Sequence, residues 1–318
     1  MSPAVGNGFT PFPHYDSAFQ FVFGTLIMSL RICAATEDLH GSLKKAIVEA
    51  GQASVDGVRL NARTELENAG LTTSAQRQIL LYAREHRLNI AALSCPTRQA
   101  LFDEEYLEQR IEVIRRSMSI VRNFETDKLI IRVGRIPDPT EQQTPLSDSG
   151  ISSEDPLGIL TPAAQKSESE QYSMLCELLN ELTTYGNHVG CTLTLQFANY
   201  DLGRIERLLT DVKGGPLQIS FDPATAIMTG AAVIPVYRSL YQHVGFVRGR
   251  DALRDVDGAG VEVAVGDGIV EWIELLPTLA EADYQGWVSV ERTGGDHRNA
   301  DVVRGVQSIR RLFPSSAL

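Results

Sequence analysis

Histidine, cysteine and positive charge are scarce in this 318-residue sequence, and each shortage excludes a class of protein. Six His leave little material for a His-rich metal cluster. The four Cys include no C-x-x-C pair, which is typical of free thiols in a reducing compartment rather than of a disulfide scaffold. With 29 Lys and Arg against 40 Asp and Glu, the net charge of −11 argues against a broad surface for nucleic acid or an anionic membrane. We therefore expect a cytoplasmic protein with neither partner.

A leader or membrane anchor is not expected either. The first basic residue is Arg31, so the positive segment that opens a secretory signal is missing. The apolar stretch 19–30 is interrupted by Gln20, Gly24 and Thr25, and it is too short to cross a bilayer. Residues 1–26 are predicted to be an N-terminal extension, and residues 27–318 a single domain.

From residue 28 onward, apolar stretches of strand length alternate with amphipathic stretches of helix length. The expected strands are 28–34, 55–62, 88–94, 127–134, 191–198, 217–222, 244–251 and 287–292. Eight strand–helix units of about 32 residues each predict an α/β protein with a (β/α)8 TIM barrel, once an insertion at 137–166 is set aside. A doubly wound open sheet is the competing fold, and the absence of a G-x-G-x-x-G turn counts against it.

The insertion at 137–166 contains five Pro and no aromatic residue. It follows the fourth strand, so in a barrel it lies on the face where catalytic groups gather. The sequence leaves open whether it is a surface loop or a lid over the site.

Three segments in the last third carry a family pattern: SFDPATAIMTG (220–230), VGFVRGRDALRD (244–255) and VAVGDGIVEWIELLPTLAEADYQGWVSVERT (263–293). They resemble the xylose isomerase-like TIM-barrel superfamily, which includes sugar isomerases, sugar phosphate epimerases, inosose dehydratases and endonuclease IV repair enzymes. The resemblance extends weakly over about 28–313. It implies a small polyol, sugar acid or sugar phosphate as substrate.

The resemblance also implies one divalent metal, held by Glu, Asp, His and Glu at the ends of strands five to eight. This sequence has Gln196, Asp222, Arg248 and Glu291 there. Gln is a weak neutral ligand, and Arg cannot ligate because its guanidinium stays protonated and lacks a free lone pair. We therefore expect no tightly bound metal. Asp222 and Glu291 are the two residues of this set that could still act as ligands. We expect Arg248 to pair with one or both carboxylates and to supply the positive charge instead.

Strand alternation gives a second, independent argument for the barrel lining. Polar residues that alternate with apolar ones face the barrel interior, and this set contains Gln196, Asp222, Glu291, Asn61 and four Arg (Arg31, Arg59, Arg132 and Arg248). Four guanidinium groups against two carboxylates leave a positive surplus inside an acidic protein. Either further acids such as Glu65 or Asp103 neutralise it, or an anionic ligand does.

The leading hypothesis is an isomerase- or epimerase-like enzyme without the usual metal, in which Glu291 acts as a base. The candidate catalytic residues are Glu291, Arg248, Asp222 and Gln196. The candidate substrate-binding residues are Arg31, Arg59, Asn61, Arg132, Asn199 and His297. The rival hypothesis is a non-catalytic barrel that binds a small anion or has a structural or regulatory role. The expected partner is a small sugar-like or anionic molecule, and the expected assembly, if any, is a homodimer.

Overall fold

The computed structural model describes residues 30–66, 72–141 and 166–312. The expected extension at 1–26 and most of the insertion at 137–166 lie outside these residues. In the part of the chain that is described, no helix combines the length and the apolar character needed to cross a membrane.

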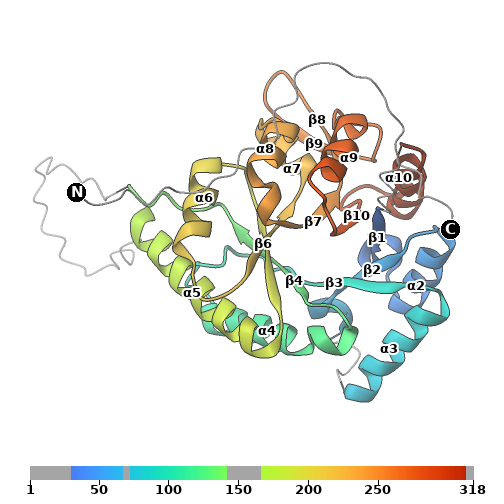
Figure 1. The fold of residues 1–318 in the computed structure, drawn as a ribbon, viewed down its shortest axis with the longest axis horizontal. Coiled ribbons are helices and arrows are strands. Elements are labelled where there is room, and N and C mark those ends of the chain that lie inside the picture. The colour runs from blue at the N-terminus through green and yellow to red at the C-terminus, as the bar shows by residue number, and fades with distance from the viewer. Residues whose placement is uncertain (1–29, 67–71, 142–165, 313–318) are drawn as a thin grey trace, which may run out of the picture.

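Eight parallel strands close into a barrel, which confirms the predicted single-domain (β/α)8 fold (Figure 1). Around the barrel the order is β1, β10, β7, β6, β5, β4, β3, β2. Their bounds are β1 (Arg31–Ala35), β2 (Gly57–Asn61), β3 (Asn89–Cys95), β4 (Lys128–Gly134), β5 (Thr192–Phe197), β6 (Leu217–Phe221), β7 (Val244–Gly249) and β10 (Trp287–Val290).

The helices surround this barrel. They are α1 (Thr36–Leu39), α2 (Leu43–Gln52), α3 (Thr73–Glu85), α4 (Leu107–Ile120), α5 (Glu168–Val189), α6 (Leu202–Asp211), α7 (Pro223–Thr229), α8 (Val233–Leu240), α9 (Trp272–Glu281) and α10 (Arg298–Leu312). The sequence predicts one helix over the amphipathic stretch 38–51, but it is interrupted at His40–Ser42, where Gly41 is a poor helix former. Helix α7 was not predicted. It begins at Pro223, with the carboxylate of Asp222 accepting the Thr225 N–H at 3.1 Å as an N-cap.

The seventh strand ends two residues earlier than predicted, because the chain leaves the barrel to form a hairpin. The hairpin pairs β8 (Asp251–Arg254) with β9 (Gly260–Val263) in antiparallel register. Its backbone lies close against α7, since a Cβ placed on Gly260 would come within 2.5 Å of Met228. The hairpin therefore brings additional side chains to the end of the barrel at which β7 finishes, its carboxyl-terminal end.

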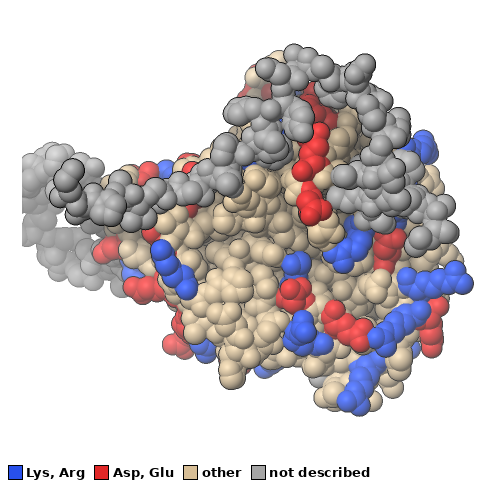
Figure 2. All heavy atoms as spheres, viewed as in Figure 1, with Lys and Arg blue, Asp and Glu red and all other residues tan. Residues whose placement is uncertain are grey.

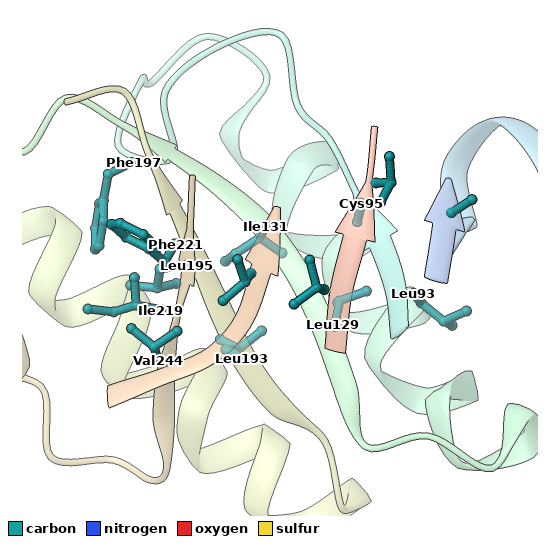
Figure 3. Close-up of a cluster of buried hydrophobic side chains, with 14 of the residues drawn as sticks. Leu93, Cys95, Leu129, Ile131, Leu193, Leu195, Phe197, Ile219, Phe221 and Val244 are labelled. Atoms are coloured by element: carbon teal, nitrogen blue, oxygen red, sulfur yellow. The ribbon is translucent and has the colours of Figure 1, made fainter. Parts of the chain in front are cut away.

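The main core lies between the strands and the helices. Figure 3 shows outward-facing apolar side chains of β3 to β6, such as Leu93, Leu129, Leu195 and Ile219, packed in one buried layer. The barrel interior holds a smaller cluster: Cys33, Ala91, Ala92, Ile130, Phe246 and Trp287. The alternation predicted from sequence is therefore confirmed in both layers.

The closing seam of the barrel joins the first strand to the last. β1 pairs with β10 from Arg31↔Trp287 to Ala34↔Val290. Beyond the strands, Arg310 of α10 donates to the Asp56 carboxylate at 2.6 Å. These contacts join residues roughly 250 positions apart in the chain.

Candidate active site at the carboxyl-terminal mouth of the barrel

A buried guanidinium stands between the two carboxylates that end β6 and β10. Arg248 Nε donates to Glu291 Oε2 at 2.8 Å, and Arg248 Nη1 donates to Asp222 Oδ2 at 3.2 Å. Asp222 and Glu291 are almost completely buried, and Arg248 is 7% exposed. The expected pairing of Arg248 is therefore present with both carboxylates. Each ion is compensated, as burial of charge requires.

A second guanidinium, which was not predicted, also binds Asp222. Arg250 Nη1 donates to Asp222 Oδ2 at 2.6 Å, and Arg250 Nη2 donates to Glu262 Oε2 at 2.8 Å. Glu262 lies on β9, so the hairpin supplies the second carboxylate. The R-G-R spacing was the available signal, because residues 248 and 250 share one strand parity.

Arg59 of β2, which is separated from β10 only by β1, completes the network. Its Nε donates to Glu291 Oε1 at 3.1 Å, its Nη1 to Ser94 Oγ at 2.6 Å, and its Nη2 to Glu37 Oε1 at 3.2 Å. The Asn61 amide also donates to Glu37. Both oxygens of Glu291 thus accept from arginines of different strands, and Arg59 and Asn61 lie at the mouth as predicted.

Loop carboxylates neutralise the arginines, so the predicted positive surplus in the lining is wrong. Glu37 and Glu262 bind Arg59 and Arg250. Glu65 turns inward, where its Oε2 accepts from Thr36 Oγ1 and from the Asn61 backbone N–H, each at 2.7 Å. Asp103 does not reach the mouth: its carboxylate accepts the Glu105 N–H ahead of α4. Of the two alternatives left open by the sequence, the ion-pair network is the one observed.

The protonation of Glu291 follows from these contacts. Burial alone would raise the pKa of Glu291, but the guanidinium groups of Arg248 and Arg59 outweigh it and hold the pKa at about 2. A carboxylate with so low a pKa and both oxygens occupied is a weak proton acceptor near neutral pH.

Asp38 is a mouth carboxyl whose pKa is shifted in the opposite direction, as burial also shifts that of Glu65. It lies on α1, 4% exposed, and its Oδ2 accepts the Arg292 N–H at 3.1 Å. Burial raises the pKa of Asp38 to about 7, and the negative charge of Glu291 adds to the rise. Asp38 lines a cleft of about 500 Å³ together with His40 and His297. The predicted site residue His297 is therefore placed beside a carboxyl that the sequence reasoning missed.

The raised pKa makes a prediction about stability. Between the unfolded value of 3.8 and the folded value of about 7, folded Asp38 holds a proton that the unfolded chain has released. Stability from this group is therefore complete below pH 3.8 and is lost as the pH rises towards 7. Asn does not titrate, so the free energy of unfolding of Asp38→Asn is expected to fall by roughly 2–4 kcal/mol less than that of wild type over this pH range. Urea denaturation across that pH range measures it, with exposed Asp296→Asn as the control. Equal slopes for Asp38→Asn and wild type would contradict the prediction.

The remaining candidates are divided between the two ends of the barrel. Arg132 and Gln196 are register partners near the carboxyl ends of β4 and β5; Arg132 is exposed, and Gln196 and the nearby Asn199 are half-buried. Arg31, in contrast, opens β1 at the amino-terminal end, where its guanidinium lies 4.9 Å from the Trp287 ring centroid and bonds the Gln285 carbonyl. Strand parity fixed its direction, but its place as the first strand residue keeps it from the mouth.

The donor set does not fit a divalent cation. Among the described residues, no group of three or more His, Cys, Asp and Glu side chains is arranged to hold a metal ion. At the positions implied by the resemblance, Arg248 brings a permanent positive charge within 3.2 Å of both carboxylates. A cation placed there would meet that charge directly.

Comparisons with known proteins agree with this fold. A family model described as xylose isomerase-like TIM barrel matches residues 45–312. No curated protein matches the chain in sequence.

Solved structures match over most of the chain. A xylose isomerase domain protein from Planctomyces limnophilus is 18% identical, with a TM-score of 0.69 over 89% of this chain and 96% of its own. A 3-keto-D-glucoside 4-epimerase from E. coli is 15% identical, with a TM-score of 0.64 over 89% and 99%. A D-psicose 3-epimerase from Clostridium cellulolyticum H10, solved with D-tagatose, is 11% identical, with a TM-score of 0.65 over 89% and 99%. At these identities the likeness shows the fold.

Proposed function

This chain belongs to the xylose isomerase-like TIM barrel family, and we propose that it acts on a small polyol, sugar acid or sugar phosphate as an isomerase- or epimerase-like enzyme without a bound divalent ion. The observation that carries the proposal is the ion pairing of Arg248 with both Asp222 and Glu291. These carboxylates stand where the family resemblance implies metal ligands.

Isomerisation or epimerisation beside a carbonyl needs a base for the carbon-bound proton and positive charge for the oxygen that becomes negative. Arg248 and Arg250 are held at the mouth by their carboxylate partners, and their remaining N–H donors would stabilise this oxygen. The pKa of about 7 favours Asp38 over Glu291 as the base, because proton transfer is most efficient when the pKa of the base lies near the working pH. In this proposal Glu291 positions Arg248 and Arg59.

The network also favours a second candidate function, a barrel that binds a small ligand without turnover. Asp222 and Glu291, the two carboxylates at ligand positions, are both saturated by guanidinium groups. Side chains held in this way stabilise the fold without being free to exchange protons.

Turnover of a panel of sugars, sugar acids and sugar phosphates tests the proposal. Activity is expected to be unchanged by chelator and by added Mn²⁺, and Asp38→Asn is expected to lower kcat by about 100-fold or more. Asp296→Asn, at the same cleft and exposed, serves as the control. Stoichiometric Mn, Zn or Co in protein purified without chelator would overturn the metal-free assignment. Saturable binding of a panel member without turnover would select the second candidate.

We also propose a reducing compartment, the cytoplasm. All four cysteines are free thiols. Burial raises the pKa of Cys33 and Cys191 to about 12, so both stay protonated and unreactive.

A further inference from the structure

Beside the mouth lies a cleft lined by three arginines that form no ion pair with an acid among the described residues. It has a volume of about 490 Å³ and is lined by residues that include Arg63, Arg98 and Arg110, with no Asp or Glu among them. We call it the arginine cleft. Arg63 follows β2 and Arg98 follows β3, so the cleft opens at the same barrel end as Asn61 and Ser94 of the network.

Arg110 is the buried member of the three. It is 8% exposed, and its guanidinium donates to the backbone carbonyls of Leu101, Asp103 and Glu105 at 2.6–3.2 Å and to the Gln99 side-chain oxygen at 2.9 Å. Every one of these acceptors is neutral. Burial lowers the pKa of Arg110, and the nearby negative charges of Asp103 and Glu105 oppose this fall. Four of its five N–H groups are occupied, so only its Nε–H is left for an anion.

Arg63, in the short helical segment Ala62–Leu66 after β2, and Arg98, in the loop after β3, are both exposed at the cleft. Within the described residues, Arg98 makes no ion pair or hydrogen bond, and the Arg63 guanidinium donates only to the Pro96 carbonyl, at 3.4 Å. Glu105 touches one lining residue, since its carboxylate accepts from the Gln99 amide at 2.7 Å, but it does not line the cleft. The arginines of the mouth are paired with carboxylates, so the two groups differ in what they have left to bind.

The other lining residues suit a small polar ligand. Helix α4 begins at the cleft, so the positive end of its dipole adds to the attraction for an anion. Tyr106, the residue before this helix, has a left-handed backbone (φ +55°) and a ring that is 64% exposed. Held in this way, the ring forms one wall against which the uncharged part of a ligand can pack.

We propose that the arginine cleft binds the phosphate group of a small phosphorylated compound, such as a sugar or polyol phosphate whose carbon chain extends towards the mouth. The guanidinium groups of Arg63 and Arg98, together with the Nε–H of Arg110, match a tetrahedral dianion in charge and in hydrogen-bond donors better than they match a single carboxylate. The assignment of substrate to this cleft rests on the proposed function, whereas the binding of phosphate itself does not.

Calorimetric titration of the full chain with inorganic phosphate, glycerol 3-phosphate, glycerate and glycerol tests the inference. Both phosphates are expected to bind at millimolar concentration or below, and glycerol is not. Arg63→Gln and Arg98→Gln are exposed substitutions, so the fold tolerates them, and each is expected to raise the Kd by about tenfold or more. Arg84→Gln, in an exposed pair with Glu125, is the matched control and is expected to leave the Kd unchanged.

The outcomes separate this inference from the proposed function. Absence of phosphate binding, equal Kd values in wild type and both cleft variants, or glycerate binding as tight as that of glycerol 3-phosphate would each overturn it. Phosphate binding that depends on Arg63 and Arg98 without turnover of any phosphorylated sugar supports the cleft and counts against the enzyme. Turnover of a sugar phosphate with a KM unchanged in Arg98→Gln supports the enzyme and overturns the cleft.

Discussion

Replacing Arg248 with methionine is expected to lower the free energy of unfolding by about 3–5 kcal/mol, because it removes one partner from a buried ion network and leaves the others charged. Of their arginine partners, Asp222 would keep only Arg250, and Glu291 would keep only Arg59. Methionine fills much of the space of the arginine stem, so the loss reports uncompensated charge more than an empty cavity.

Urea denaturation of Arg248→Met, Glu291→Gln and the double variant measures this effect. The double variant is expected to lose less stability than the sum of the two single losses. Arg248 and Glu291 are partners, so removing both leaves neither of them as an unpaired buried charge. Arg84→Met removes an exposed ion pair with Glu125 and is expected to cost under about 1 kcal/mol. A loss for Arg248→Met as small as this control would mean that the network contributes little to the fold.

Asp251→Asn is expected to cost about 3 kcal/mol or more, although it changes few atoms. The buried Asp251 carboxylate accepts four N–H donors: Ala252 N and Val270 N at Oδ1, and Gly266 N and Trp272 Nε1 at Oδ2, all at 2.9–3.1 Å. An Asn side chain has one carbonyl oxygen, so its NH₂ group must face two of these donors. The hairpin and the start of α9 would lose their common anchor.

Unfolding followed by tryptophan fluorescence suits this variant, because Trp272 is one of only two tryptophans and loses its hydrogen bond. Asp257→Ala, an exposed change on the same hairpin, is expected to stay within about 0.5 kcal/mol of wild type. If Asp251→Asn does the same, the four hydrogen bonds do not anchor the hairpin.

Regular strands made the barrel and half of its mouth predictable from sequence. Alternation assigns a direction to every strand residue, and it placed Arg59, Asp222, Arg248 and Glu291 in one network. It does not assign a height along the barrel, which is why Arg31 was expected at the wrong end.

The site residues that were not predicted come from segments in which apolar and polar residues do not alternate as they do along a barrel strand. Glu37 and Asp38 follow β1 in a short helix, and Glu262 comes from a hairpin outside the barrel. Two signals were nevertheless present. Asp257-Gly258 lies between two alternating stretches, which is typical of a hairpin turn, and T-E-D directly follows a strand that ends at the mouth. On the face drawn in Figure 2, the Lys and Arg side chains that can be seen are interspersed among Asp and Glu.

The closing seam ties the charge network to the order in which a ribosome makes the chain. Arg59 is synthesised more than 200 residues before Glu291. One edge of β1 stays unpaired until β10 has been made. Loop closure over such a distance is slow, and unpaired strand edges attract other chains in the meantime. Until β10 and Glu291 have been made, β1 lacks its strand partner, and Arg59 and Arg248 lack a carboxylate that they bind in the fold. A chaperone that shields the edge of β1 would therefore have to stay bound until β10 has been made.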